Sequence, residues 1–166
     1  MKRFFTTLTN NYNAKTAFQK SCYYKIDFKI PENATVYQAV QKFAAYNIGC
    51  LAVTNNDKVV GVISERDYIT KIALLGRSSK ETKISEICTF EPNLLTVKEN
   101  DSIHLCMNKM MLKNTRHLLV LDNDDKNVIG LLSIKDLIKE VLGEKDELIQ
   151  KLGNFNVGKG GFFEQY

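Results

Sequence analysis

The feature that most constrains this fold is a unit that occurs twice in the chain. Residues 32–54 align with residues 99–121 without a gap, at a constant separation of 67 positions. After a turn two residues longer in the second copy, VVGVISERD at 59–67 matches VIGLLSIKD at 128–136. Both copies therefore carry Gly-x-x-Ser-x-x-Asp at the same place. Such internal repetition predicts two equivalent structural halves that share one core.

Each copy predicts the order helix, strand, strand, helix. Apolar side chains recur at helical spacing over 36–47 and 103–114, after the N-cap hydroxyls of Thr35 and Ser102. Two short β-rich runs follow in each copy, at 51–53 and 59–63 and at 118–121 and 128–132. Second helices are expected over 65–74 and 134–142, each stopped by a glycine. This order predicts an α/β (α+β) fold in which two small sheets, each flanked by helices, pack together.

Composition excludes several classes of protein. At 44% apolar and 25% charged residues, the chain of 166 residues is ordinary globular material. No apolar run approaches the roughly 18 residues of a membrane helix. Four widely spaced cysteines and two histidines form no CxxC or HxxxH pattern, so we expect neither a disulfide framework nor a metal site.

The first 25 residues differ in charge from the rest. Residues 1–26 hold five basic side chains and no acidic one, whereas the remainder has 18 basic and 19 acidic side chains. A hydroxyl-rich, basic, acid-free start is typical of a mitochondrial transit peptide; a disordered basic leader on a cytoplasmic protein is the alternative. We expect this leader to be dispensable for folding. The near-neutral body disfavours a nucleic-acid surface.

Specific strings then point to a family. They are NIGCLAV at 47–53, GVISERDYITK at 61–71, GRSSKET at 76–82, RHLLV at 116–120 and GLLSIKD at 130–136. The repeat resembles the CBS domain, and the tandem resembles a CBS pair, or Bateman module. The resemblance and the composition of the two ends together predict a leader at 1–25, repeats at 26–76 and 93–143, a connection at 77–92, and a C-terminal helix with a flexible Gly/Phe tail at 144–166.

The two Ser-x-x-Asp pairs allow two interpretations. A serine followed three residues later by an acid at a helix start is a capping box, and the helix dipole favours the acid there. In the family this resembles, the aspartate accepts the ribose hydroxyls of a nucleotide and the serine faces its phosphate. Carried over, Ser64 and Asp67 serve one cleft, and Ser133 and Asp136 serve the other. One serine can do both.

Basic side chains distinguish the second copy. Arg116 and His117 begin a strand where the first copy has Gly49 and Cys50. By resemblance, Arg116 and His117 contact phosphate, and Arg66 is a further candidate. The two sites are therefore expected to be unequal. The sequence leaves open which Ser-x-x-Asp pair shares a cleft with the Arg116–His117 dyad.

These residues imply a regulatory module without catalytic residues. No nucleophile is set beside a base, and no Walker or GxGxxG motif is present. The resemblance implies that an adenine nucleotide (AMP, ATP or NAD(H), with AMP and NAD(H) favoured) binds between the repeats. It also implies a homodimer that signals to a separate protein target, in the mitochondrial matrix or, without targeting, in the cytoplasm. The alternative is a ligand-free interaction or assembly module.

Overall fold

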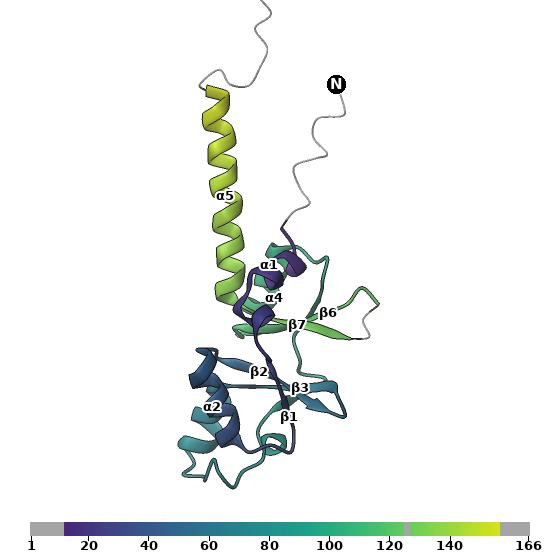
Figure 1. The fold of residues 1–166 in the computed structure, drawn as a ribbon, viewed down its shortest axis with the longest axis vertical. Coiled ribbons are helices and arrows are strands. Elements are labelled where there is room, and N and C mark those ends of the chain that lie inside the picture. The colour runs from purple at the N-terminus through teal and green to yellow at the C-terminus, as the bar shows by residue number, and fades with distance from the viewer. Residues whose placement is uncertain (1–11, 125–126, 157–166) are drawn as a thin grey trace, which may run out of the picture.

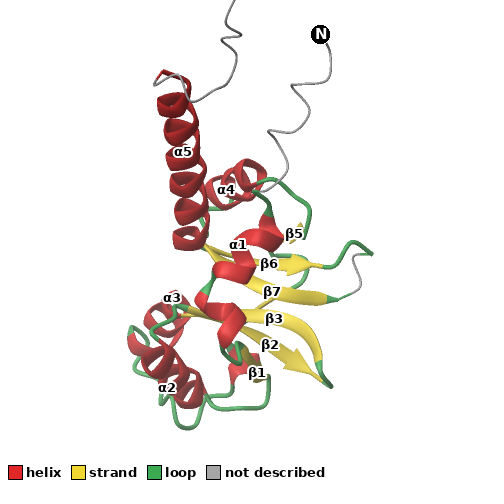
Figure 2. Ribbon diagram, turned by 45° about the horizontal axis from the view of Figure 1, so that its top comes forward, coloured by secondary structure: helices red, strands yellow, loops and turns green. Residues whose placement is uncertain are grey.

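Two small sheets form the centre of the molecule (Figures 1 and 2). The computed structural model describes residues 12–124 and 127–156. The first sheet has the order β1-β2-β3-β4 and the second the order β5-β6-β7. Their bounds are β1 Lys29–Pro31, β2 Cys50–Asn55, β3 Lys58–Ser64, β4 Thr89–Phe90, β5 Thr96–Lys98, β6 His117–Leu121 and β7 Val128–Ser133. No helix among the described residues is long and apolar enough to cross a membrane.

The predicted repeat is confirmed by the strand register. The parallel pair β1–β2 aligns Lys29 with Ala52, and the parallel pair β5–β6 aligns Thr96 with Leu119, which is the same pairing moved by 67 positions. The hairpins β2–β3 and β6–β7 are antiparallel, and each contains an irregularity at the equivalent place. In Figure 2, α2 (Val36–Tyr46) and α3 (Glu65–Tyr68) lie beside one sheet, and α4 (Ile103–Leu112) and α5 (Ile134–Asn156) lie beside the other.

The first helices of the repeats follow the prediction closely. Helix α2 spans Val36–Tyr46 and α4 spans Ile103–Leu112. The hydroxyls of Thr35 and Ser102 accept hydrogen bonds from the N3 amides of these helices, at 3.3 and 3.2 Å. Each cap thus satisfies one backbone donor that the first turn would otherwise leave without a partner.

The second helices differ from one another. In the first repeat, α3 (Glu65–Tyr68) continues as a π-helical turn, η2 (Ile69–Ala73), and ends near Gly76 as expected. In the second repeat, α5 runs over Ile134–Asn156, straight through Gly143. A helical glycine costs only about 1 kcal/mol relative to alanine, and the good helix formers that follow Gly143 outweigh it. The C-terminal part of α5 projects from the body (Figure 1). The expected tail begins after it, and residues 157–166 lie outside the described residues.

The N-terminal boundary also differs from the sequence-based one. Residues 14–25 form helix α1 (Ala14–Lys20) and the 3-10 turn η1 (Cys22–Lys25), where the sequence suggested a leader. Ala14, Ala17 and Tyr23 are at most 2% exposed and belong to the core. Since these side chains are buried, a leader that is dispensable for folding must end before this segment. The most N-terminal part, residues 1–11, lies outside the described residues.

The same segment completes the second repeat. The amides of Ala14 and Lys15 donate to the carbonyls of Asp101 and Glu99, at 2.9 Å each. In the first repeat, the amides of Ile84 and Ser85 donate to the carbonyls of Ala34 and Glu32, at 2.9 and 3.0 Å. Residues 84–90, which include η3 (Ile84–Glu86) and β4, thus close the first repeat as α1 closes the second. The N-terminal segment is therefore the structural counterpart of the inter-repeat connection.

Candidate functional site

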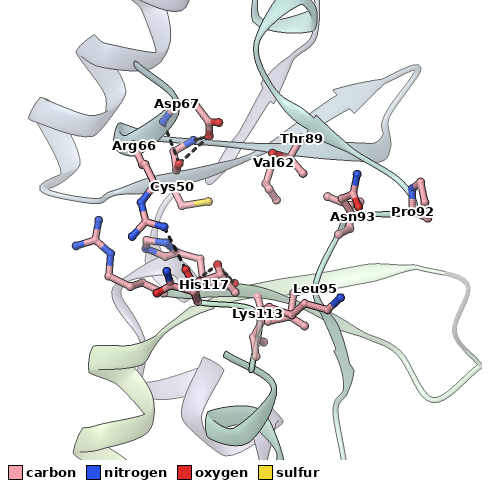
Figure 3. A pocket seen from close by; sticks show the side chains of 16 residues that line it. Cys50, Val62, Arg66, Asp67, Thr89, Pro92, Asn93, Leu95, Lys113 and His117 are labelled. Atoms are coloured by element: carbon pink, nitrogen blue, oxygen red, sulfur yellow. Dashed lines mark hydrogen bonds between the residues drawn. The ribbon is translucent and has the colours of Figure 1, made fainter. Parts of the chain in front are cut away.

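The principal cleft lies between the two repeats (Figure 3). It is a cavity of about 390 Å³. One side is formed by β3 and the start of α3, and the other by the segment 113–118 that leads into β6. Ser64 and Asp67 of the first repeat line this cleft together with Arg116 and His117 of the second, a meeting of the repeats that the sequence left open.

Ser64 and Asp67 form a closed capping box at the start of α3. The Asp67 carboxylate accepts from the Ser64 amide at 2.9 Å and from the Ser64 hydroxyl at 2.7 Å, both through Oδ2. The Asp67 amide donates back to the Ser64 hydroxyl at 3.4 Å. The capping interpretation of the sequence is therefore correct for this pair. It leaves the other carboxylate oxygen, Oδ1, available for a different partner.

That partner is Lys71, one helical turn further along the chain. The Lys71 ammonium donates to Asp67 Oδ1 at 2.7 Å and to the Ile87 carbonyl. Each carboxylate oxygen has two acceptor positions, so one position of Asp67 remains when the three bonds from Ser64 and Lys71 are counted. Sequence reasoning missed Lys71, although its i,i+4 spacing from Asp67 is the usual signal of a helical ion pair.

Three cations gather around the cleft. Arg66, exposed on α3, donates to the Asn114 carbonyl of the other repeat at 3.1 Å. Lys113 and Arg116 are also exposed, and neither is in an ion pair with the part of the chain that the structure describes. With Asp67 as the one carboxylate in the lining, the cleft is net positive. Lys113 was not predicted, because a lysine in a turn after a helix is ordinary surface composition.

His117 enters the cleft uncharged. Burial, together with the adjacent Arg116 guanidinium, lowers the pKa of His117 to about 4. At neutral pH the imidazole therefore offers one hydrogen-bond donor and one acceptor but no charge. In this state His117 can contact a phosphate as a neutral hydrogen-bond donor but not as a cation.

Apolar side chains form the remaining wall. They come from β3, from the segment before β5 and from β6, and are Val62, Leu94, Leu95 and Leu118. A cleft with an apolar wall, a carboxylate that can accept hydroxyls and several cations suits a ligand with a flat ring, a sugar and an anionic group.

A second cleft contains the other Ser-x-x-Asp pair. This cavity of about 350 Å³ is lined by Ser133 and Asp136 and also by Tyr23. Ser133 caps α5 as Ser64 caps α3: its hydroxyl and amide donate to Asp136 Oδ2 at 2.6 and 2.9 Å. Arg116 and His117 line both clefts. The described residues contain no cluster of three or more His, Cys, Asp or Glu side chains that could hold a metal ion.

Comparison with known proteins identifies the family. The family model of the CBS domain matches residues 26–74 and again residues 84–143. The chain belongs to the CBS-domain family. It is a CBS pair, and the resemblance noted in the sequence is confirmed.

Individual relatives agree with this assignment. The mitochondrial CBS domain-containing protein CBSX3 of Arabidopsis thaliana is 38% identical over 127 residues, which cover 75% of this chain and 61% of CBSX3. This CBS pair thus spans about three fifths of that relative's length. A CBS-domain protein from Burkholderia ambifaria has 34% identity and a TM-score of 0.71, covering 79% of this chain and 94% of its own.

A more distant structure carries a ligand. The CBS domain protein PAE2072 from Pyrobaculum aerophilum, complexed with AMP, has a TM-score of 0.63 and 24% identity, covering 75% of this chain and 88% of its own. At that identity the likeness concerns the fold alone.

Proposed function

We propose that this CBS pair is a non-catalytic sensor that binds an adenine nucleotide, AMP or NAD(H) in preference to ATP, in the principal cleft. The observation that carries the proposal is the meeting of Asp67 from one repeat with Arg116 and Lys113 from the other across one cavity. Neither repeat supplies both the carboxylate and these cations. The AMP bound by the Pyrobaculum protein supports the choice of ligand class.

Each side chain has a distinct role in this proposal. The Asp67 carboxylate accepts the ribose hydroxyls, and Lys71 gives up or shares its position on Oδ1. The Ser64 hydroxyl, Arg66 and Arg116 face the phosphate, with bidentate hydrogen bonding available to the two guanidinium groups. Neutral His117 contributes a hydrogen bond, and Val62 and Leu95 flank the base.

Calorimetric titration of the full chain with AMP, NADH and ATP tests the proposal. Asp67→Asn replaces a charged acceptor by an amide, and the loss of one charge-assisted hydrogen bond costs about 1.5–3 kcal/mol, or roughly tenfold to a hundredfold in affinity. Asp57→Asn, in the β2–β3 turn and not part of the cleft lining, is the matched control and should bind as the wild type does. Wild-type protein that binds none of the three nucleotides would contradict the proposal and favour a ligand-free assembly module.

The output of the sensor is proposed to reach a separate protein. A ligand that contacts both repeats favours one arrangement of their interface over others, and a partner protein can bind preferentially to that arrangement. We also propose a homodimer and, from the mitochondrial relative, a mitochondrial location. A pull-down with and without AMP tests binding of the partner protein. Fluorescence imaging of the tagged full chain tests the location. Nucleotide-independent partner binding or a diffuse cytoplasmic signal would count against them.

A further inference from the structure

We infer that Lys71 competes with the ribose of the nucleotide for Asp67, and that its second contact, with the inter-repeat connection, joins this competition to the position of the connection. The inference rests on the proposed function, because it takes Asp67 as the group that accepts the ribose hydroxyls. It assigns a regulatory role to a lysine that does not itself line the principal cleft.

The number of acceptor positions on Asp67 is the first argument. Oδ2 accepts from the Ser64 amide at 2.9 Å and from the Ser64 hydroxyl at 2.7 Å, and Oδ1 accepts from the Lys71 ammonium at 2.7 Å. The two carboxylate oxygens offer about four positions, so one position is open. A ribose brings two neighbouring hydroxyls, and both can donate to Asp67 only if one of these three bonds breaks.

Lys71 is the donor that leaves most readily. The Ser64 amide and hydroxyl belong to the capping box of α3, which the Asp67 amide closes by donating to the Ser64 hydroxyl at 3.4 Å. The Lys71 side chain is 41% exposed, whereas the Asp67 side chain is 14% exposed, so a released ammonium finds water as its new partner. A ribose that displaces Lys71 therefore leaves the helix cap intact.

Lys71 is also bonded to the inter-repeat connection. It lies in the π-helical turn η2 and donates to the carbonyl of Ile87, which is 2% exposed and directly follows η3. Two residues further on, Thr89 pairs with Val62 of β3, and both line the principal cleft. The Ile87 carbonyl holds the ammonium within reach of Asp67, so a shift of the connection changes how strongly Lys71 competes. By reciprocity, a ribose on Asp67 changes the hold of Lys71 on the connection.

The second repeat has the same link with the charges exchanged. Glu140 follows Asp136 by four residues, as Lys71 follows Asp67. It is 3% exposed and accepts from Lys20 of α1, the closing segment of that repeat, at 2.9 Å. An ionised carboxylate cannot donate a hydrogen bond, so Glu140 cannot occupy an acceptor position of Asp136. The link between this helix position and the closing segment is therefore common to both repeats, and the competing helical cation belongs to the first.

Calorimetric titration of the full chain with AMP and with 2′-deoxy-AMP tests the competition. The two nucleotides carry the same phosphate, but 2′-deoxy-AMP has a single ribose hydroxyl and needs only the open position of Asp67. Lys71→Met removes the competing ammonium and keeps an unbranched side chain. The preference for AMP over 2′-deoxy-AMP should then rise roughly threefold to fivefold, as expected for the loss of a partly exposed ion pair. The lost lysine charge acts on both nucleotides alike and cancels in this ratio.

Two further variants complete the titration. Lys83→Met removes an exposed lysine of the connection that does not line the cleft, and should leave the preference unchanged. Lys71→Gln can still donate to the Ile87 carbonyl, and should raise the preference as well, so it decides if Lys71→Met does not fold. An unchanged or reduced preference in the folded Lys71 variants would overturn the inference and leave the proposed function in place. A wild type that binds no AMP would contradict the proposed function, and the inference with it.

Hydrogen exchange of residues 84–90 tests the contact with the connection. At saturation both nucleotides meet Thr89 in the same way, but only AMP displaces Lys71. The backbone amides of 84–90 should therefore exchange faster with AMP than with 2′-deoxy-AMP bound to the wild type, and at equal rates in Lys71→Met. The wild-type comparison needs no variant to fold. Equal exchange with the two nucleotides in the wild type would overturn the link between the competition and the connection.

Discussion

Lys42 and Lys109 show what residue identity between the repeats means. The Lys42 ammonium donates to the Lys29 carbonyl at 2.7 Å, and the Lys109 ammonium donates to the Thr96 carbonyl at 3.0 Å. Both bonds join the first helix of a repeat to its parallel strand, at positions 67 residues apart. Asn47 and Asn114 are likewise both left-handed, with φ of 52° and 47°, a conformation that asparagine tolerates better than most residues. Shared residues of this kind hold the repeat together.

Functional differences therefore reside in residues that the copies do not share. His117 is one of these, and its burial makes it sensitive to acid. The unfolded chain takes up a proton on this side chain near pH 6.5, but the folded protein does so only near pH 4. Because the folded-state pKa is depressed, this histidine favours unfolding as the pH falls from 6.5 toward 4, and has no such effect at pH 7 and above.

Urea denaturation of wild type and His117→Asn at pH 7 and pH 4 measures this effect. The wild type should lose about 3 kcal/mol more unfolding free energy between the two pH values than His117→Asn does, since asparagine does not titrate. Carboxylates titrate in both proteins and largely cancel in the difference. Parallel losses in the two proteins would show that His117 titrates normally.

At the scale of elements, the closing segments explain the shared glycine of Gly-x-x-Ser-x-x-Asp. A Cβ on Gly61 would lie 2.7 Å from the Thr89 carbonyl oxygen of β4, and a Cβ on Gly130 would lie 2.7 Å from the Phe18 ring of α1. In each repeat, the closing segment comes close to the second strand of the hairpin: β4 pairs with β3 beside Gly61, and α1 places Phe18 against Gly130 of β7. Glycine is needed because that approach leaves no room for a side chain.

Thermodynamic coupling between Phe18 and Gly130 tests the docking of α1. Gly130→Ala should destabilise the protein by about 1–3 kcal/mol through overpacking against the ring. In a Phe18→Ala background, the same substitution should cost much less, because the ring that it meets is gone. The measurement is a double-mutant cycle in urea. Additive effects would mean that α1 does not pack on β7 in solution.

The central elements could be predicted from sequence, but α1 could not. Helices α2 and α4 follow capping hydroxyls and have apolar residues at helical spacing along their whole length. Their first residues can therefore be predicted from the sequence. The seven residues of α1 bury only Ala14, Ala17 and Phe18, and the polar, basic surroundings of this short pattern match a targeting leader equally well. Its helical state depends on contacts with the second repeat, more than 80 residues away in sequence.

The same limit applies to the site. The Ser-x-x-Asp pairs and the Arg116–His117 dyad are visible as motifs, since they recur or break a repeat. Which pair lines a given cleft with Arg116 and His117 depends on how the repeats pack. The ion pair of Lys71 with Asp67 and the place of Lys113 in the cleft lining are likewise known only from the structure. The depressed pKa of His117 is likewise a product of burial.

At the scale of the whole molecule, the helices leave a large apolar surface uncovered. Its most exposed members are Ile69, Leu74 and Leu75 after α3, Met111 and Leu112 at the end of α4, and Ile138, Leu142, Leu148, Ile149 and Leu152 along α5. Leu112 is 85% exposed and Leu74 is 77% exposed. Both repeats contribute, each through its helices. Large apolar side chains exposed in this way are candidates for an interaction site.

The predicted homodimer would bury this surface. Two modules that face each other through their helices would form a four-repeat disk, and α5 of each chain would gain a partner along its apolar side. Light scattering at micromolar concentration should therefore give twice the chain mass of 18.9 kDa. Leu74→Glu combined with Leu112→Glu places charges in the interface, where an unpaired buried charge costs several kcal/mol, and should shift the protein to monomer. Lys58→Gln, a change of one charge in the β2–β3 hairpin away from these helices, should remain dimeric. A wild-type monomer, with and without AMP, would leave the exposed leucines to a different partner protein and remove the dimer from the proposed mechanism.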